Sequence, residues 1–243
     1  MIRIISGIYK GRRLKLVPSS SVRPMQDKVK GAVFNILADR LRASVCLDGF
    51  SGTGSIGLEA LSRGAAKCVF VDEFYPSVKV IKQNIAKCEA EEKSVVLNKE
   101  FNRAVIDLAK QGVRFDIIFL DPPYRLLEER NPLKVIRKRG LLKPGGLIVM
   151  RHYFKTKIKL GDFKLVRRVT LGDDVLALFT TLPPEAAEVP AASGPSSLAA
   201  EPPAPATKDP KRLPARPLSP KPGSFTNRGG PQGKNAPREI EKK

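Results

Sequence analysis

Apolar residues between positions 43 and 182 follow two alternating spacings. Five short runs are almost continuously apolar and have the length of strands: "SVCLD", "KCVFVD", "SVVLN", "FDIIFLD" and "LIVM". The segments between them space apolar residues three and four apart, which predicts helices. Apolar strands that alternate with helices indicate a parallel sheet covered on both faces. Two further runs, "FKLVRRVTLG" and "DVLALFTTL", predict an antiparallel pair at the end of the sheet.

The first 42 residues show a different pattern. Two short strands, Arg3–Ile5 and Arg13–Val17, flank the turn "SGIYKG". The segment "RPMQDKVKGAVFNILADRLR" then carries apolar residues at helical spacing, with Asp27 near its start. We therefore expect residues 1–42 to form a hairpin and a helix, attached to a domain of residues 43–182.

The composition changes after residue 182. Residues 183–243 hold 14 of the 21 prolines and no periodic apolar pattern. A segment of this kind cannot bury enough apolar surface to offset its chain entropy. We expect residues 183–243 to be a disordered tail with extended polyproline character.

The charge of the chain narrows the class of partner. The sequence has 44 Lys and Arg against 24 Asp and Glu, a net charge of +20. The tail contributes only 10 basic and 6 acidic residues, so most of the excess belongs to residues 1–182. Such an excess favours nucleic acid or an anionic membrane as the partner. Because no apolar stretch suits a signal peptide or a membrane span, we expect a cytoplasmic protein without a membrane partner.

Cysteine and histidine are too few and too scattered for a metal site. Cys46, Cys68 and Cys88 form no C-x-x-C pair, and His152 is the single histidine. We expect no metal and no structural role for disulfides, with three reduced thiols in the core of a cytoplasmic protein.

Acidic residues follow the predicted strands. Asp48, Asp72 and Asp121 fall at the carboxyl ends of three strands, and Glu100 follows a fourth by two positions. Ligands of open α/β sheets bind outside these strand ends. The alternative for Asp48 and for Glu100 is that each only caps a helix.

The spacing Gly52-x-Gly54-x-x-Gly57 matches the dinucleotide fingerprint at a strand-to-helix turn, which is a weak signal by itself. A pyrophosphate at this turn requires positive potential. The carboxylate of Asp48 at the entrance of the loop opposes it and favours a cationic ligand group, such as the α-ammonium of a methionine moiety. Asp72 lies 20 residues after Gly52, which suits ribose hydroxyls in either case.

The segment Asp121-Pro122-Pro123-Tyr124 decides between these ligands. Two prolines fix the backbone after a strand and lack N–H groups. The Asp121 carboxylate and the Pro122 carbonyl can then both accept hydrogen bonds from one exocyclic amine, while Tyr124 stacks on the attached base. An aromatic amine is a poor nucleophile because its lone pair is delocalised. Two acceptors on its hydrogens aim that lone pair at an electrophile.

With these motifs the chain resembles the RsmD family of bacterial 16S rRNA guanine-N2 methyltransferases, which are class I S-adenosylmethionine-dependent enzymes. The resemblance rests on "RIISG", "KGRRL", "RPMQDKVKGAVFNIL", "LDGFSGTGSIGLEALSRGA", "VFVD" and "LDPPY", in this order. It implies a Rossmann-like α/β fold with a seven-stranded, mostly parallel sheet. It also implies methylation of a guanine in 16S rRNA, in a small ribosomal subunit that is still being assembled.

The resemblance assigns roles to matching positions. Cofactor binding is expected of Asp48, Phe50, Ser51, Gly52, Thr53, Gly54, Asp72, Glu100 and Phe101. Asp121, Pro122, Pro123 and Tyr124 are expected to hold the guanine amine. RNA contact is expected of Arg3, Lys10, Arg12, Arg13, Arg23 and Lys28. This chain departs from the family pattern at Met25-Gln26, at Gly31 and at Arg151, where relatives carry Thr-Thr, Glu and Glu.

Other functions stay open on the sequence alone. The amine-holding segment also suits a DNA base or a protein glutamine amide as the substrate. A catalytically idle RNA-binding assembly factor is a further alternative, supported by Gly31 and Arg151. We expect a monomer.

Overall fold

The computed structural model describes residues 2–18, 25–123, 126–127 and 131–181, all in the first of the two units of the chain, residues 1–191. Tyr124, Arg23 and the expected tail, 183–243, lie outside the described residues.

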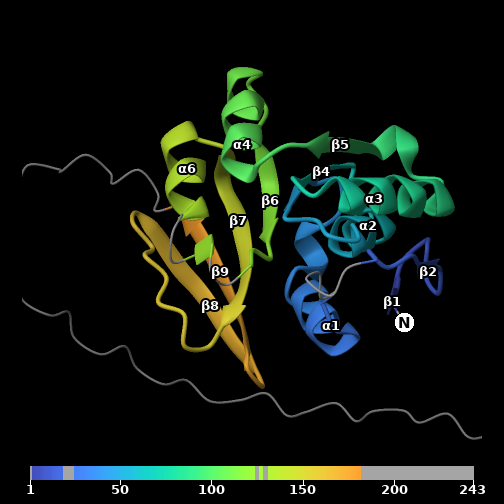
Figure 1. Ribbon diagram of the computed structural model, residues 1–243. Helices are drawn as coiled ribbons and strands as arrows, with labels where there is room; N and C mark the ends of the chain where they lie inside the picture. The colour runs from blue at the N-terminus through green and yellow to red at the C-terminus, as the bar shows by residue number, and fades with distance from the viewer. Residues whose placement is uncertain (1, 19–24, 124–125, 128–130, 182–243) are drawn as a thin grey trace, which may run out of the picture. The chain divides into compact units, whose positions relative to one another are not determined.

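A seven-stranded sheet forms the centre of the unit (Figure 1), in the order β5-β4-β3-β6-β7-β9-β8. Strands β5, β4, β3, β6 and β7 are parallel, whereas β9 runs antiparallel to both β7 and β8. The fold class expected from the apolar pattern is therefore confirmed. The strands are β3 (Val45–Gly49), β4 (Lys67–Asp72), β5 (Ser94–Asn98), β6 (Phe115–Leu120), β7 (Leu142–Tyr153), β8 (Phe163–Leu171) and β9 (Asp174–Thr181).

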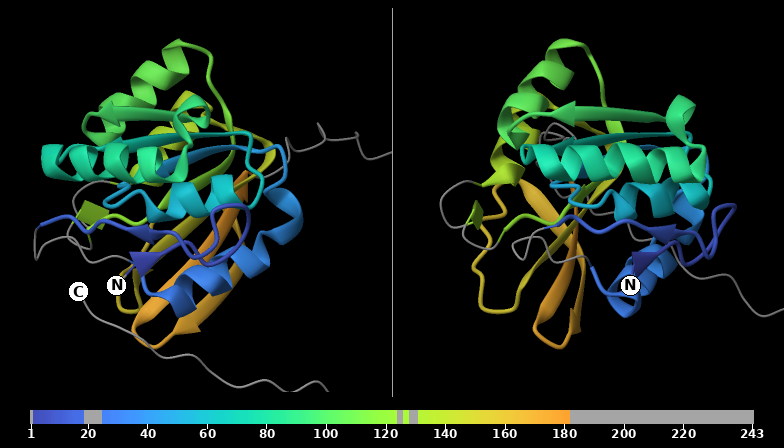
Figure 2. Two further views of the ribbon diagram at one scale, coloured as in Figure 1. Left: turned by 90° about the vertical axis from the view of Figure 1, so that its right-hand side faces the viewer. Right: turned by 45° about the vertical axis from the view of Figure 1, so that its right-hand side comes forward.

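Helices cover both faces of this sheet (Figure 2). The buried residues of α1, α2 and α3 join one apolar cluster, and those of α4 and α6 join a second cluster on the opposite face. Parallel strands between two such layers read as continuous apolar runs, which explains the sequence pattern. The helices are α1 (Asp27–Ile36), α2 (Ser55–Ser62), α3 (Tyr75–Cys88), α4 (Phe101–Lys110) and α6 (Pro132–Arg139), with short 3-10 turns η1 (Ala38–Arg40) and η2 (Glu91–Lys93).

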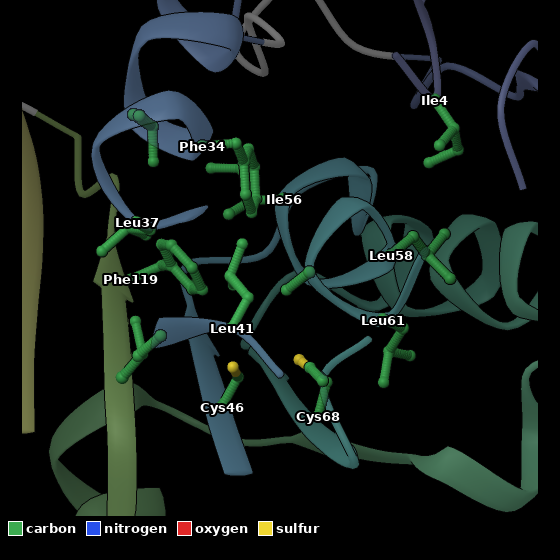
Figure 3. Packing of buried hydrophobic residues seen from close by; sticks show 14 of the residues in the cluster. Ile4, Phe34, Leu37, Leu41, Cys46, Ile56, Leu58, Leu61, Cys68 and Phe119 are labelled. Atoms are coloured by element: carbon green, nitrogen blue, oxygen red, sulfur yellow. The ribbon is translucent and has the colours of Figure 1, made fainter. Parts of the chain in front are cut away.

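The packing of α1 against the sheet is aromatic at its centre. Figure 3 shows Phe34 of α1 facing Phe119 of β6, and the two ring centroids lie 5.7 Å apart. Both side chains are buried, and burial of one such side chain contributes about 1.5–3 kcal/mol. Cys46 and Cys68 lie in the same cluster as free, buried thiols, as expected.

The N-terminal hairpin is shorter than the sequence suggested. Its strands are β1 (Ile2–Arg3) and β2 (Arg13–Leu14). The backbone N–H groups that would extend the ladder are directed to side chains instead. Those of Ile5 and Ser6 donate to Glu59 of α2 at 2.7 and 3.0 Å, and that of Lys15 donates to Asn84 of α3 at 2.7 Å. The hairpin is thus fastened to two helices of the main domain.

Candidate active site

A cavity of about 1090 Å³ opens at the carboxyl ends of the parallel strands. From β3 the chain proceeds to β4 and β5 on one side, whereas β6 and β7 lie on the other. The sheet order therefore reverses between β3 and β6, which is where α/β sheets bind their ligands. The cavity walls include residues that follow β3, β4, β5 and β6.

The glycine loop forms the wall after β3. Phe50, Gly52 and Gly54 have φ angles of +65°, +55° and +75°, so the loop turns sharply before α2. Such angles cost glycine little, and Gly54 is the N-cap of the helix. The hydroxyl of Ser51 donates to the Asp48 carbonyl at 2.6 Å and accepts from the Val71 N–H at 3.0 Å, which ties the loop to β3 and β4.

Gly57 has a packing role. A Cβ at this position would lie 2.3 Å from a ring carbon of Phe70 and 2.7 Å from the sulfur of Cys68. The third glycine of the spacing therefore lets α2 approach β4 closely, as in other nucleotide-binding turns.

Asp48 lies beneath the loop. Its side chain is buried and is not part of the cavity wall described for this chain. The Oδ2 atom accepts a hydrogen bond from the Gly57 N–H at 2.9 Å, one of the donors that the first turn of a helix leaves unpaired. Burial raises the pKa of Asp48 well above its ordinary value, against the lowering effect of that N–H. The carboxylate thus satisfies a donor in the first turn of α2, although the N-cap residue of that helix is Gly54.

Asp72 ends β4 and faces the cavity. Its two carboxylate oxygens accept hydrogen bonds from the N–H of Gly52 at 2.7 Å and of Phe74 at 2.9 Å. Burial raises its pKa, and these two N–H groups oppose the rise. Each carboxylate oxygen has a second lone pair, so Asp72 can still accept a hydroxyl.

Glu100 and Phe101 bound the cavity beyond β5. Glu100 is the N-cap of α4 and accepts from the Arg103 N–H at 3.0 Å, so it both caps the helix and borders the cavity. The Phe101 ring stacks on Phe50, with centroids 4.7 Å apart and planes 25° apart. This pair gives the cavity a flat apolar wall.

Asp121, Pro122 and Pro123 follow β6 on the other side of the cavity. Oδ2 of Asp121 accepts from Nη1 of Arg151 on β7 at 3.2 Å. The pKa of Asp121 is raised to about 6, chiefly by burial and also by the charge of Asp174, against the lowering effect of Arg151. Tyr124, the fourth residue of this segment, lies outside the described residues.

Comparison with known proteins identifies the family. The family model described as "Conserved hypothetical protein 95" matches residues 2–180. Ribosomal RNA small subunit methyltransferase D of Haemophilus influenzae is 37% identical over 177 residues, which cover 70% of this chain and 89% of the relative. YlbH of Bacillus subtilis, a candidate rRNA methyltransferase, is 36% identical over 180 residues, which cover 73% of this chain and 98% of the relative.

A solved structure leads to the same family. The candidate methyltransferase yhhF of Escherichia coli is 32% identical, with a TM-score of 0.63, and the match covers 74% of this chain and 97% of that one. The chain belongs to the RsmD-like methyltransferase family. The fold of this family is that of class I methyltransferases, and its cofactor is S-adenosylmethionine.

The cavity of this RsmD-like methyltransferase fits that cofactor. Its wall after β3 is a tightly turned loop whose backbone reaches the surface, and its wall after β4 ends in a carboxylate that suits hydroxyls. The stacked pair Phe50 and Phe101 suits a planar base. Seven of the expected cofactor residues border the cavity, namely Phe50, Ser51, Gly52, Thr53, Asp72, Glu100 and Phe101, whereas Asp48 and Gly54 are absent from its described wall.

Sequence reasoning did not find the residues that complete the cavity from β7 and from the β8–β9 turn. Arg151, Tyr153 and Asp174 lie in its wall. Arg151 also forms an ion pair with Asp174, with Nε 3.2 Å from Oδ1. Arg151 stood out in the sequence only as a departure from the family, since its contact with Asp121 spans 30 residues of sequence.

The basic residues expected at the RNA interface of the methyltransferase fall into two groups. Arg3 pairs with Asp27 at 3.2 Å, and Lys28 is exposed two positions after Gln26, which borders the cavity. Arg12 instead contacts the Lys87 carbonyl and Glu89 at the C-terminal end of α3. That helix starts beside the cavity and is about 20 Å long, so the turn of the hairpin, with exposed Lys10 and Arg13, is remote from the cavity.

No helix among the described residues has the length and apolar character needed to cross a membrane. Within the same ranges, no group of three or more His, Cys, Asp or Glu side chains is arranged to hold a metal ion.

Proposed function

We propose that this enzyme transfers a methyl group from S-adenosylmethionine to the exocyclic N2 amine of a guanine in 16S rRNA. The proposal is carried by one observation: the Asp121-Pro122 segment borders the same cavity as the glycine loop. A hydrogen-bond acceptor for an amine therefore faces the side of the cavity that suits the cofactor. The small-subunit rRNA methyltransferases among the relatives support rRNA as the substrate.

The cofactor is expected on the side of β3, β4 and β5. Asp72 accepts the ribose hydroxyls, Phe101 and Glu100 flank the adenine, and the turn from Phe50 to Gly54 borders the methionine moiety. Asp48 acts from beneath by holding the first turn of α2. When bound, S-adenosylmethionine supplies an electrophilic methyl group.

The amine is expected on the side of β6. Asp121 and the Pro122 carbonyl accept its two hydrogens, and Tyr124 stacks on the base. Methylation of an amine releases one proton, and Asp121 is the group placed to take it. A flipped-out guanine is required, because a base that stays stacked in a helix cannot enter a cavity of the protein.

RNA is expected to cross the cavity mouth between two basic surfaces. One comprises Arg3 of β1 and Lys28 of α1, and Lys10, Arg12 and Arg13 extend it along the hairpin. Arg23 is also expected to contact RNA but lies outside the described residues. Exposed ion pairs such as Arg3–Asp27 are weak, so a phosphate can displace the acid.

The second surface follows Tyr153, which borders the cavity. The exposed ring of Phe154 lies 4.7 Å from that of Tyr153. The next residues up to position 170 include one acid, Asp162, which pairs with Arg137 at 3.5 Å. They also include six exposed basic side chains: Lys155, Lys157, Lys159, Lys164, Arg167 and Arg168. Aromatic and basic side chains in succession suit single-stranded RNA, through stacking and phosphate contact.

Transfer of tritium from labelled cofactor tests the substrate. We expect label on small ribosomal subunits from cells that lack this protein, and nucleoside digestion should place it on N2-methylguanosine. Label on DNA or on a protein glutamine instead would contradict the proposal, and absence of transfer with intact cofactor binding would favour an idle assembly factor. Asp121→Ala should abolish transfer and keep the affinity for S-adenosylhomocysteine.

The proposal extends to the setting of the enzyme. We propose a cytoplasmic monomer in which residues 1–42 contact RNA, residues 43–182 bind the cofactor and residues 183–243 are dispensable for catalysis. The free state of the three cysteines fits a reducing compartment. A chain ending at residue 183 should keep the melting temperature and the transfer rate of the full chain. A fall in either one would show that the C-terminal residues belong to the domain.

A further inference from the structure

Arg151 connects two carboxylates that, like Arg151 itself, border the cavity. Its Nη1 donates to Oδ2 of Asp121 at 3.2 Å, and its Nε lies 3.2 Å from Oδ1 of Asp174. The three side chains are only 12, 18 and 21% exposed, so water screens these contacts little. The guanidinium is a rigid planar group of donors, and the hydrogen bond from Nη1 constrains the orientation of Asp121.

The contact leaves one oxygen of Asp121 available. Within the described residues, Arg151 contacts Oδ2, and no hydrogen bond to Oδ1 is found. A carboxylate held by one oxygen presents the other in a fixed direction. Asp121 borders the cavity. Its Oδ1 atom is therefore the oxygen to which the amine of the substrate can donate a hydrogen bond.

We propose that Arg151 is a positioning residue for methyl transfer: it holds Asp121 by Oδ2, places a positive charge beside that carboxylate and links it to Asp174 at the start of β9. The inference rests on the proposed function, in which Asp121 accepts a hydrogen bond from the guanine amine that receives the methyl group. Asp174 opposes the effect of Arg151 on Asp121, since it forms an ion pair with the same guanidinium and repels the charge on Asp121.

Removal of Arg151 and removal of Asp174 should shift the pKa of Asp121 in opposite directions. Arg151 faces it from β7, Asp174 from β9, and Asp48 from β3, where the two carboxyl groups repel each other. Burial raises the pKa of Asp121, Arg151 lowers it and Asp174 raises it. Loss of the arginine should therefore raise this pKa, and loss of the aspartate should lower it.

The test compares pH–rate profiles of single-turnover methyl transfer for four variants. Arg151→Gln should move the acidic limb to higher pH by about one unit or more, because an opposite charge at this distance shifts a carboxyl by that amount. Asp174→Asn should move the limb to lower pH. Arg151→Lys keeps the charge and should keep the limb near its wild-type position. Arg137→Gln is the matched control, because it breaks an arginine–aspartate pair elsewhere and should shift nothing.

A second measurement does not depend on activity. Carboxyl carbon NMR of selectively labelled aspartate should show the Asp121 resonance titrating at higher pH in Arg151→Gln and at lower pH in Asp174→Asn. Unchanged titration in folded variants would overturn the role of Arg151. Shifted titration without any transfer by the wild-type enzyme onto rRNA would leave the arginine's role intact and overturn the proposed function. If Arg151→Gln fails to fold, Arg151→Lys and Asp174→Asn still test the role of Arg151, since the first should leave the titration of Asp121 unchanged and the second should lower its pKa.

Discussion

The carboxylate of Asp48 accepts a hydrogen bond from the backbone N–H of Gly57 at 2.9 Å. This contact joins the end of β3 to the first turn of α2 beneath the glycine loop. The acid that the resemblance assigned to cofactor binding therefore makes its hydrogen bond to the helix that follows the glycine loop.

Two substitutions of Asp48 distinguish a role in stabilising the first turn of α2 from direct contact with the cofactor. Asp48→Ala leaves a buried N–H unpaired and should lower the free energy of unfolding by about 1–3 kcal/mol. Asp48→Asn keeps an acceptor without the charge and should bind S-adenosylhomocysteine with near wild-type affinity. Urea denaturation and calorimetric titration measure the two effects. A large loss of affinity in a stable Asn variant would show that the charge itself contacts the cofactor.

Gly57 and Gly31 should respond in opposite directions to alanine. At Gly57 the added methyl group collides with Phe70 and Cys68, so Gly57→Ala should cost about 1–3 kcal/mol of stability. At Gly31, inside α1, the added Cβ meets no atom within 4 Å. Gly31→Ala should therefore stabilise the protein by about 0.5–1 kcal/mol through helix propensity. Thermal denaturation decides, and destabilisation at both positions would contradict the packing described for α1.

Glu59 should matter more for stability than Lys30, although both side chains are fully buried. Glu59 holds Arg63 at 2.8 Å, Lys30 at 3.6 Å and the backbone of Ile5 and Ser6. Glu59→Gln leaves the ammonium of Lys30 without its counter-charge and should cost about 3–5 kcal/mol.

Lys30→Met is the comparison for Glu59→Gln. It removes one cation from a carboxylate that keeps its other donors, so the loss should be smaller. Hydrogen exchange at Ile5 and Ser6 should rise only in the Glu59 variant. Equal losses in the two variants would show that the Lys30–Glu59 pair dominates the network.

Asp121 should make the protein less stable at neutral pH than at acidic pH. Burial raises its pKa from 3.8 to about 6 in the folded protein, so the folded state binds a proton more readily than the unfolded chain between these values. The stabilising effect of protonation is therefore lost as the pH rises through about 6. Asp121→Asn should raise the free energy of unfolding at ~pH 7.5 by about 1–3 kcal/mol, and the gain should vanish near pH 4.

Urea denaturation across this pH range measures the effect. Asp162→Asn serves as the control, because its side chain is 71% exposed and should change stability little at any pH. A gain that does not depend on pH would show that burial of the Asp121 charge is not its source.

The apolar pattern was enough to predict the order of strands and helices, because burial on both faces of a parallel sheet imposes continuous apolar runs. It also placed Asp72, Glu100 and Asp121 at one edge, since parallel strands deliver their carboxyl ends to the same side. Element ends were less well determined. The hairpin strands stop early because the N–H groups of Ile5 and Lys15 bond to helix side chains that no local pattern reveals.

What each charged side chain faces depends on the folded arrangement of the strands. Asp48 lies near the end of β3 and Asp72 ends β4, yet Asp48 accepts a hydrogen bond from the first turn of α2 whereas Asp72 borders the cavity. Arg151 reaches Asp121 because β6 and β7 are neighbours, and Asp174 reaches Arg151 because β9 returns beside β7. Such contacts depend on how strands pair across the sheet, which a periodicity within one segment does not encode.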